Sequence, residues 1–130
     1  MTGDTRKKLI IDTDCGSDDA MAIAMALRDP AYEILMFTIV SGNVEADQAA
    51  RNTLLTIERA GSCEPPVYMG ARNMLLKELA FAYETHGQDG MGDLGLAPER
   101  LRLGEGHGVW RMLEALRDSE EGEIDIITLG

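Results

Sequence analysis

The sequence has little basic charge, few cysteines and no long apolar run. Its 12 Lys and Arg residues are outnumbered by 23 Asp and Glu residues, which gives a formal net charge of −11. Nucleic acids and anionic membrane surfaces are bound through basic faces, so this balance argues against both as partners. No apolar run approaches the roughly 20 residues of a membrane span. The N-terminal MTGDTRKK also lacks the apolar core of a signal peptide.

The two cysteines, Cys15 and Cys63, are too few and too far apart for a disulfide framework or a cysteine zinc site. We interpret both as reduced thiols, as in a cytoplasmic protein. A length of 130 residues, 45% of them hydrophobic, is enough to bury one sizeable core. We therefore expect a single domain over residues 1–130.

Apolar runs and turn residues predict alternating strands and helices. Strands are expected over 7–13 and 32–42, within the segment PPVYMGA, and in EIDIITLG near residue 130. Helices are expected after an N-cap at Ser17, over 45–59 with Gly61 as C-cap residue, over 73–83 and over 109–117. This order predicts an α/β fold with an open, mostly parallel, Rossmann-like sheet.

Two further expectations concern packing and the long connection before residue 109. Every residue from 20 to 27 is apolar, so this helix should be buried nearly all round, with Met21 and Met25 in the core. Trp110 is likewise expected in the core. Residues 85–108 contain seven glycines, and we expect a long mobile loop there, which in a compact domain is usually functional.

Four carboxylates lie within eight residues of LIIDTDCGSDDA, namely Asp12, Asp14, Asp18 and Asp19. The first pair follows a predicted strand and the second pair opens a helix, so all four should meet at the sheet edge where open α/β folds bind ligands. Gly16 allows the tight turn between them. Any one of these residues could simply cap a helix or accept loop amides. Four together repel one another unless they are solvated, protonated or bound to a cation.

Oxygen ligands without a nearby Cys or His pair favour Ca²⁺ or Mg²⁺ over Zn²⁺. An EF-hand is excluded by spacing, because its fifth and twelfth positions counted from Asp12 would be Gly16 and Ile23. Neither glycine-rich phosphate motif follows the first strand. A DxD metal-dependent phosphohydrolase of the haloacid dehalogenase type remains a minor alternative, although Gly16 stands where that motif has Thr or Val.

The segment DTDCGSDDAMAI resembles the N-terminal signature of the inosine–uridine nucleoside hydrolases, roughly D-T-D-P-G-x-D-D-A. The similarity continues, in order, through SGNV, PVYMGA, HGQDGMGD and IITLG, with Cys15 where the family usually has Pro. The resemblance implies Ca²⁺-dependent hydrolysis of the N-glycosidic bond of ribonucleosides, in purine and pyrimidine nucleoside salvage. Members of that family are about twice this length. The resemblance therefore also implies that this chain is the N-terminal portion of the nucleoside hydrolase fold.

The resemblance implies roles for the acidic residues of the first motif. Asp14 and Asp19 would ligate Ca²⁺, and Asp14 would also be the general base that takes a proton from a water on the metal. Asp18 would accept a hydrogen bond from a ribose hydroxyl. Asp12 and Gly16 would support the turn.

The later segments carry weaker implications. Asn43 would orient the site or touch the ribose, and His86 and Asp89 would belong to a lid over the base. The remaining metal ligands and the acid for the leaving base would lie after residue 130.

Two alternatives share the same acidic cluster. One is a non-catalytic protein that binds Ca²⁺ and ribose, and the other is an inactive fragment of the hydrolase. The isolated 130-residue chain is itself expected to be inactive, and a homo-oligomer or a companion chain is expected to complete the fold.

Overall fold

The computed structural model describes residue 3 and residues 5–130, in which strands and helices alternate. The strands are β1 (Lys7–Thr13), β2 (Tyr32–Ile39), β3 (Val67–Met69) and β4 (Ile124–Thr128). The helices are α1 (Ser17–Arg28), α2 (Ala46–Ala60), α3 (Tyr83–His86) and α4 (Gly108–Arg117). All strand pairs are parallel in the order β3-β2-β1-β4, which confirms the predicted fold class.

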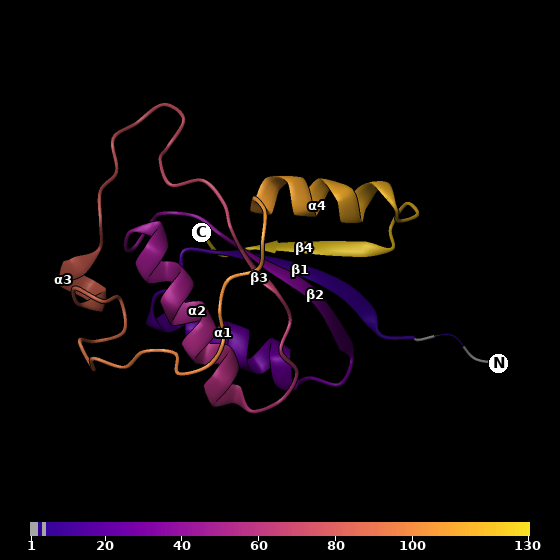
Figure 1. The fold of residues 1–130 in the computed structure, drawn as a ribbon, viewed down its shortest axis with the longest axis horizontal. Helices are drawn as coiled ribbons and strands as arrows, with labels where there is room; N and C mark the ends of the chain where they lie inside the picture. The colour runs from indigo at the N-terminus through magenta and orange to yellow at the C-terminus, as the bar shows by residue number, and fades with distance from the viewer. Residues whose placement is uncertain (1–2, 4) are drawn as a thin grey trace.

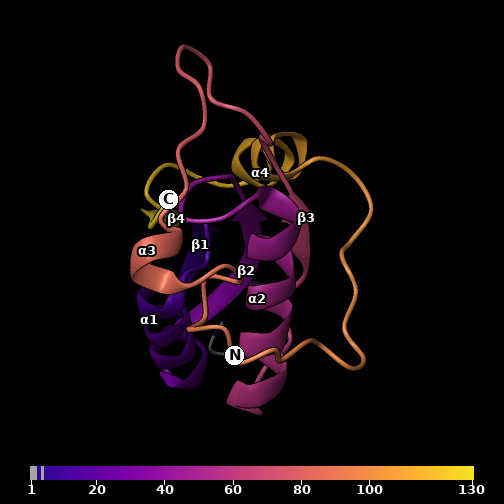
Figure 2. The ribbon, with the colours of Figure 1, turned by 90° about the vertical axis from the view of Figure 1, so that its left-hand side faces the viewer.

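Helices cover both faces of the sheet. Helices α1 and α2 lie together on one face, and α4 lies on the other, over β2 and β3 (Figures 1 and 2). The chain therefore passes from β1 to β2 on one face and reaches β4 on the opposite face. The strand order changes direction beside β1, and open α/β sheets bind their ligands at the carboxyl ends of strands next to such a point.

The core fills the space between β1, β2 and the pair of helices α1 and α2. Leu9 and Ile11 alternate along β1 toward that face and contact Phe37 of β2 and Ile23 of α1 in one buried cluster. The period of two along β1 sends the intervening residues, including Asp12, toward the opposite face. Strand β1 thus has an apolar middle over residues 9–11, with two lysines at its start and Asp12 near its end.

Most predicted elements are confirmed within a few residues, but the helix expected over 73–83 is wrong. A short helix, α3, begins only at Tyr83, and the residues before it form turns and irregular chain. Leu75 and Leu76 are almost fully exposed there. A helix in a protein is stabilised mainly by burying an apolar face, and this segment has no surface to pack against. The second strand also ends earlier than predicted, at Ile39.

Three predictions about single side chains are also wrong. The N-cap of α1 is Gly16 rather than Ser17, and no side chain caps this helix end. Met21 and Met25 are 70% and 73% exposed, because their spacing of four places both on the side of α1 that faces away from the sheet. Trp110 is exposed on α4.

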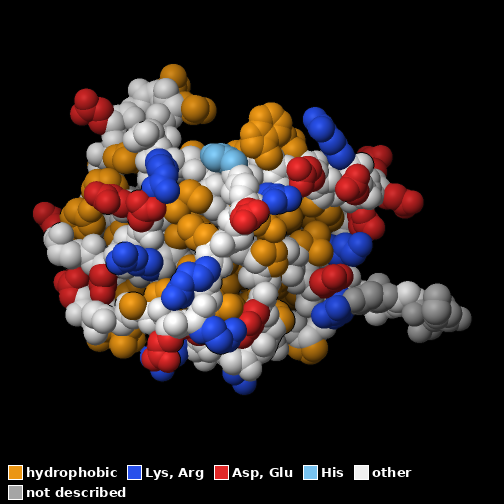
Figure 3. Space-filling model, in the orientation of Figure 1, with side chains coloured by type: hydrophobic (Ala, Val, Ile, Leu, Met, Phe, Trp, Pro, Cys, Tyr) orange, Lys and Arg blue, Asp and Glu red, His pale blue; other side chains and the backbone are white. Residues whose placement is uncertain are grey.

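The surface carries mixed charge. On the face shown in Figure 3, Lys and Arg side chains are interspersed with Asp and Glu side chains and with apolar ones. No helix within residues 3 and 5–130 is long and apolar enough to cross a bilayer.

Candidate metal and ribose site

Asp14 follows the last residue of β1 and is almost completely buried, with 6% of its surface exposed. Its Oδ2 accepts a hydrogen bond from the backbone N–H of Asn43 at 2.7 Å, which joins the end of β1 to the turn after β2. Gly42 makes this approach possible, since a Cβ at that position would overlap the Asp14 carboxylate. The backbone therefore fixes the direction of this side chain.

The second carboxylate oxygen of Asp14, Oδ1, lacks a hydrogen-bond donor of this kind in the described part of the chain. Oδ1 is buried, and no donor within the described residues forms a hydrogen bond with it. Leaving a buried polar atom unpaired costs about 1–3 kcal/mol, and more for a charged group. A buried carboxylate oxygen without a protein donor is typical of an oxygen that ligates a cation.

Asp19, in the first turn of α1, is also buried, with 5% of its surface exposed. Its Oδ2 accepts a hydrogen bond from Thr13 Oγ1 at 2.7 Å. Burial, followed by the neighbouring Asp14 carboxylate, raises the pKa of Asp19 to about 7. Two carboxylates in this arrangement resist being ionised together, and a bound cation would remove that resistance.

Asp18, His86 and Asn43 surround Gly16. His86 Nδ1 lies 4.0 Å from Asp18 Oδ1 and 3.1 Å from Ser17 Oγ. A Cβ on Gly16 would stand 2.9 Å from Asn43 Nδ2 and 3.3 Å from both Asp18 Oδ1 and His86 Nδ1. Residues far apart in the sequence thus meet beside the acidic turn, with the glycine leaving room between them.

Asp12 has a separate environment. Thr38 Oγ1 on β2 donates a hydrogen bond to Asp12 Oδ1 at 2.6 Å, and the two residues are register partners in the sheet. Burial raises the pKa of Asp12, the Thr38 hydrogen bond opposes this shift, and the Asp14 charge adds to it. This residue stabilises the end of β1 from the opposite face and does not join the Asp14–Asp19 pair.

The four carboxylates therefore do not form one ligand set. Among residues 3 and 5–130, no three His, Cys, Asp or Glu side chains are grouped closely enough to hold a metal ion. The Asp14–Asp19 pair still fits a hard cation, because both groups offer only oxygen and one buried oxygen lacks a partner. Two carboxylates are fewer than the six to eight ligands that Ca²⁺ takes.

Asp89 organises the glycine-rich loop rather than the acidic turn. Its Oδ1 accepts hydrogen bonds from the backbone N–H groups of Met91 and Asp93, both at 2.8 Å. Asp93 in turn accepts from the N–H of Gln88 at 2.7 Å. The loop after α3 is thus held by its own side chains, and Asp89 turns its carboxylate to the loop backbone.

Asn52 was missed by the sequence reasoning. It lies on α2, and its side-chain amide donates to the backbone oxygens of Cys15 and Asp89. A polar residue in the middle of a predicted helix gives no signal of such contacts, since they depend on how α2 packs.

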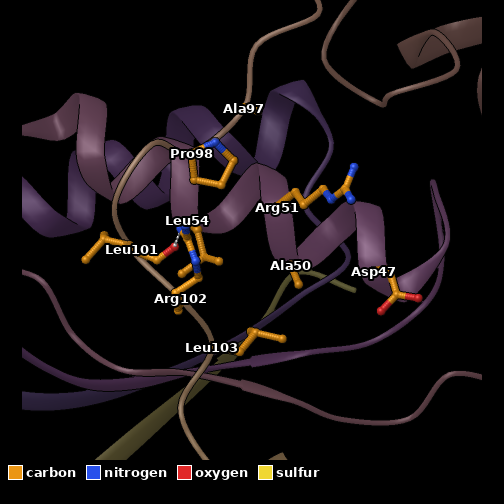
Figure 4. A pocket seen from close by; sticks show the side chains of 9 residues that line it. All are labelled: Asp47, Ala50, Arg51, Leu54, Ala97, Pro98, Leu101, Arg102 and Leu103. Carbon is orange, nitrogen blue, oxygen red and sulfur yellow. Dashed lines mark hydrogen bonds between the residues drawn. The ribbon is translucent and has the colours of Figure 1, made fainter.

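A hollow of about 850 Å³ lies away from the acidic turn. It is formed between α2 and the segment that crosses it before α4, with Pro98 and Leu101 on one side and Arg51 on the other (Figure 4). None of the four aspartates of the first motif lines it. We place the functional site at the turn, where the carboxylates are, and assign no ligand to this hollow.

A family model described as inosine-uridine preferring nucleoside hydrolase matches residues 9–130. The chain belongs to the inosine-uridine preferring nucleoside hydrolase family. The match includes the acidic turn and β4, and so confirms the resemblance seen in the first motif.

Relatives within the nucleoside hydrolases agree in sequence and in fold. Uridine nucleosidase 1 of Arabidopsis thaliana is 40% identical over 125 residues, which are 95% of this chain and 37% of the relative. Inosine-uridine preferring nucleoside hydrolase of Leishmania major is 32% identical, over 95% of this chain and 40% of the relative. The solved purine-preferring ribonucleoside hydrolase of Gardnerella vaginalis superposes with a TM-score of 0.87 at 28% identity, covering 95% of this chain and 40% of that one. The chain thus spans about 40% of the length of these nucleoside hydrolases.

Proposed function

We propose that the chain supplies the Asp14 half of a nucleoside hydrolase site, which hydrolyses the N-glycosidic bond of ribonucleosides to free base and ribose with the help of Ca²⁺. The observation that supports this most directly is the buried, unpartnered Oδ1 of Asp14 beside the Asp19 carboxylate. Both are expected to be metal ligands. When bound, Ca²⁺ would lower the pKa of a water molecule and hold ribose hydroxyls in place.

Asp14 is proposed as the general base. Its Oδ2 is occupied by the Asn43 N–H, so Oδ1 is the oxygen left to take a proton from the attacking water. A general base typically contributes 10²–10⁴-fold to a rate. The fixed position of the carboxylate keeps the accepting oxygen directed toward one place, which is what proton transfer in a transition state requires.

The ribose is proposed to lie over Gly16. Asp18 would accept a hydrogen bond from a ribose hydroxyl, and Asn43, which lies near the same side of Gly16, would orient or contact the sugar. Cleavage of a glycosidic bond develops positive charge at C1′, which nearby carboxylates stabilise. An acidic site suits an uncharged nucleoside better than a nucleotide. His86 is proposed to lie at the edge of the base.

A companion chain or a homo-oligomer is proposed to complete the site. The chain spans about 40% of its relatives, and the metal needs more ligands than Asp14 and Asp19 supply. On β4, one of the two edge strands of the described sheet, Ile126 and Ile127 are each 42% exposed, as a surface that receives further structure would be. A cytoplasmic location agrees with the free thiols of Cys15 and Cys63.

Calorimetry with Ca²⁺ tests the metal site. We expect binding heat at millimolar Ca²⁺ in the unaltered chain and none with Asp14→Asn. Asp118→Asn, which removes the same charge from an exposed position after α4, should bind like the unaltered chain. Absence of heat in the unaltered chain at millimolar Ca²⁺ would overturn the proposed metal site.

Activity separates the hydrolase from the alternatives. The purified chain, with any companion polypeptide identified by intact mass, is incubated with inosine and uridine, and the release of reducing sugar is measured. The proposal expects release that falls at least about 100-fold with Asp14→Asn. Calcium binding without sugar release once the companion polypeptide or the oligomer is present would instead support a non-catalytic Ca²⁺- and ribose-binding protein.

A further inference from the structure

Asn52 connects the acidic turn to the glycine-rich loop. The residue lies on α2 and is 2% exposed. Its Nδ2 donates to the carbonyl oxygen of Cys15 at 2.9 Å and to that of Asp89 at 2.7 Å. Its Oδ1 accepts from Gln48 Nε2 at 3.0 Å, which fixes which end of the amide faces the two carbonyls. Both amide hydrogens are therefore used on two backbone segments that are distant in the sequence.

The two segments are the ones that the proposed site depends on. Cys15 stands between Asp14 and Gly16, so its carbonyl belongs to the turn that directs the carboxylate pair. Asp89 follows His86 and sets the course of the loop through its own hydrogen bonds. One buried amide thus holds the turn and the loop at a fixed separation.

Close packing at Gly90 supports this reading. Gly90 has a φ of +75°, and a Cβ there would stand 2.8 Å from Val44 Cγ1 and 3.2 Å from Asn52 Nδ2. The loop backbone therefore approaches Asn52 and the start of α2 as closely as the chain allows. A side chain at this position would push the loop away from the amide that holds it.

We propose that Asn52 is a positioning residue that couples the order of the loop over residues 87–95 to that of the acidic turn. It touches neither reacting atoms nor metal and acts through the Cys15 and Asp89 backbones. The part of this inference that concerns Ca²⁺ rests on the proposed function. Coupling of this kind is reciprocal, so an ion that orders the turn would also order the loop, to the same extent that an ordered loop favours the ion.

Amide hydrogen exchange in the metal-free chain tests the coupling without any ligand. Asn52→Asp keeps the size of the side chain but replaces the two N–H donors with carboxylate oxygens facing two carbonyls. We expect amide exchange at Met91 and Asp93 and around Cys15 to accelerate together by about tenfold or more. The reason is that the two buried hydrogen bonds holding these segments are lost. Asn52→Ser, which keeps one donor, should accelerate the same amides if Asn52→Asp does not fold.

Leu54→Ala is the matched control on α2. Leu54 is buried and contacts neither the turn nor the loop through hydrogen bonds, so its truncation destabilises the fold without touching the proposed link. It should leave the ratio of loop exchange to exchange in the β1 core unchanged. The positioning role would be refuted if loop exchange were unaltered in the Asn52 variants. It would also be refuted if Leu54→Ala raised the ratio of loop exchange to β1 exchange as much as they do.

A second arm adds Ca²⁺ to the same exchange measurement. In the unaltered chain, millimolar Ca²⁺ should slow exchange both in the turn and at Met91 and Asp93, and in Asn52→Ser it should slow the turn alone. Slowing of the turn without slowing of the loop in the unaltered chain would refute the coupling. If Ca²⁺ slows neither segment, the proposed metal site fails, and the metal-free arm still decides the role of Asn52.

Discussion

The hydroxyl of Thr13 donates a hydrogen bond to the buried carboxylate of Asp19 at 2.7 Å. The same oxygen accepts from the backbone N–H of Cys15 at 3.0 Å. One fully buried side chain thus joins the last residue of β1, the turn that follows it and the first turn of α1. The carboxylate pair is positioned by this contact as much as by the strand itself.

Replacing Thr13 with Val keeps the shape of the side chain and removes the hydroxyl. We expect Thr13→Val to weaken Ca²⁺ binding about tenfold, because the Asp19 carboxylate loses its hydrogen-bond donor and becomes free to rotate. Thr13→Ser retains the hydroxyl and should bind within about threefold of the unaltered chain. Calorimetry with Ca²⁺ measures both, and equal affinities for Val and Ser would show that the hydroxyl does not position the carboxylate.

Gly42→Ala tests the contact behind Asp14. The added Cβ would stand 2.8 Å from both Cβ and Cγ of Asp14, so the side chain or the turn must shift. We expect a loss of about 1–3 kcal/mol in the free energy of unfolding, together with weaker Ca²⁺ binding. Gly61→Asn is the control: φ is +64° there, which Asn tolerates, and no atom lies within 4 Å. Denaturant unfolding of the two variants checks this, and equal stabilities would contradict it.

Truncating two residues of α1 should lower the stability by very different amounts. Ile23 is fully buried against the sheet, whereas Met25 is exposed on the other side of the same helix. Ile23→Ala should lower the free energy of unfolding by about 2–5 kcal/mol through lost burial and a cavity. Met25→Ala should change it by no more than about 0.5 kcal/mol. A large loss for Met25→Ala would mean that this face of α1 is covered in the protein as purified.

Glu58 gives a prediction for pH. Its carboxylate accepts backbone hydrogen bonds from Leu101, Glu99 and Arg100, which lower the pKa of Glu58 from 4.5 to about 2. Because the pKa is lowered in the folded chain, the ionised form favours folding. This contribution is fully present above pH 4.5 and is lost as the pH falls toward 2.

Comparison with Glu58→Gln isolates this contribution. Both proteins share every other carboxylate, so the difference between their denaturant midpoints should be constant above about pH 5 and should shrink steadily from there to pH 2. Thermal or urea unfolding at several pH values measures the difference. A difference that does not change over this range would show that Glu58 does not hold the segment over residues 99–101.

Local pattern allowed the sheet to be predicted, and with it the carboxylates at the end of β1, whereas the choice of Asp14 and Asp19 among them came from the family resemblance. An apolar strand that ends in carboxylates before an apolar helix leaves few ways to fold. The exposure of Met21 and Met25 could not be read in this way, since it depends on which side of α1 the sheet occupies. Asn52 was hidden for the same reason, as both of its partners come from other parts of the chain.

The irregular conformation of residues 73–82 could not be predicted either. Their composition suits a helix, but a helix needs a surface on which to bury one face, and the fold provides none there. His86 was expected in a mobile loop, but it is the last residue of the short helix α3. Its position beside Gly16 and Asp18 depends on the path of that loop across α2.

The pairing of β1 with β4 delays the completion of the sheet around β1 while the chain is being synthesised. Lys8 lies opposite Ile124 and Asp12 opposite Thr128, so the strand that carries the carboxylates gains its second neighbour from residues synthesised more than a hundred positions later. During translation, β1 has only β2 beside it for most of the time that the chain is emerging. Closing such a distant contact is slow. The acidic turn should therefore take its final form only after β4 has joined the sheet.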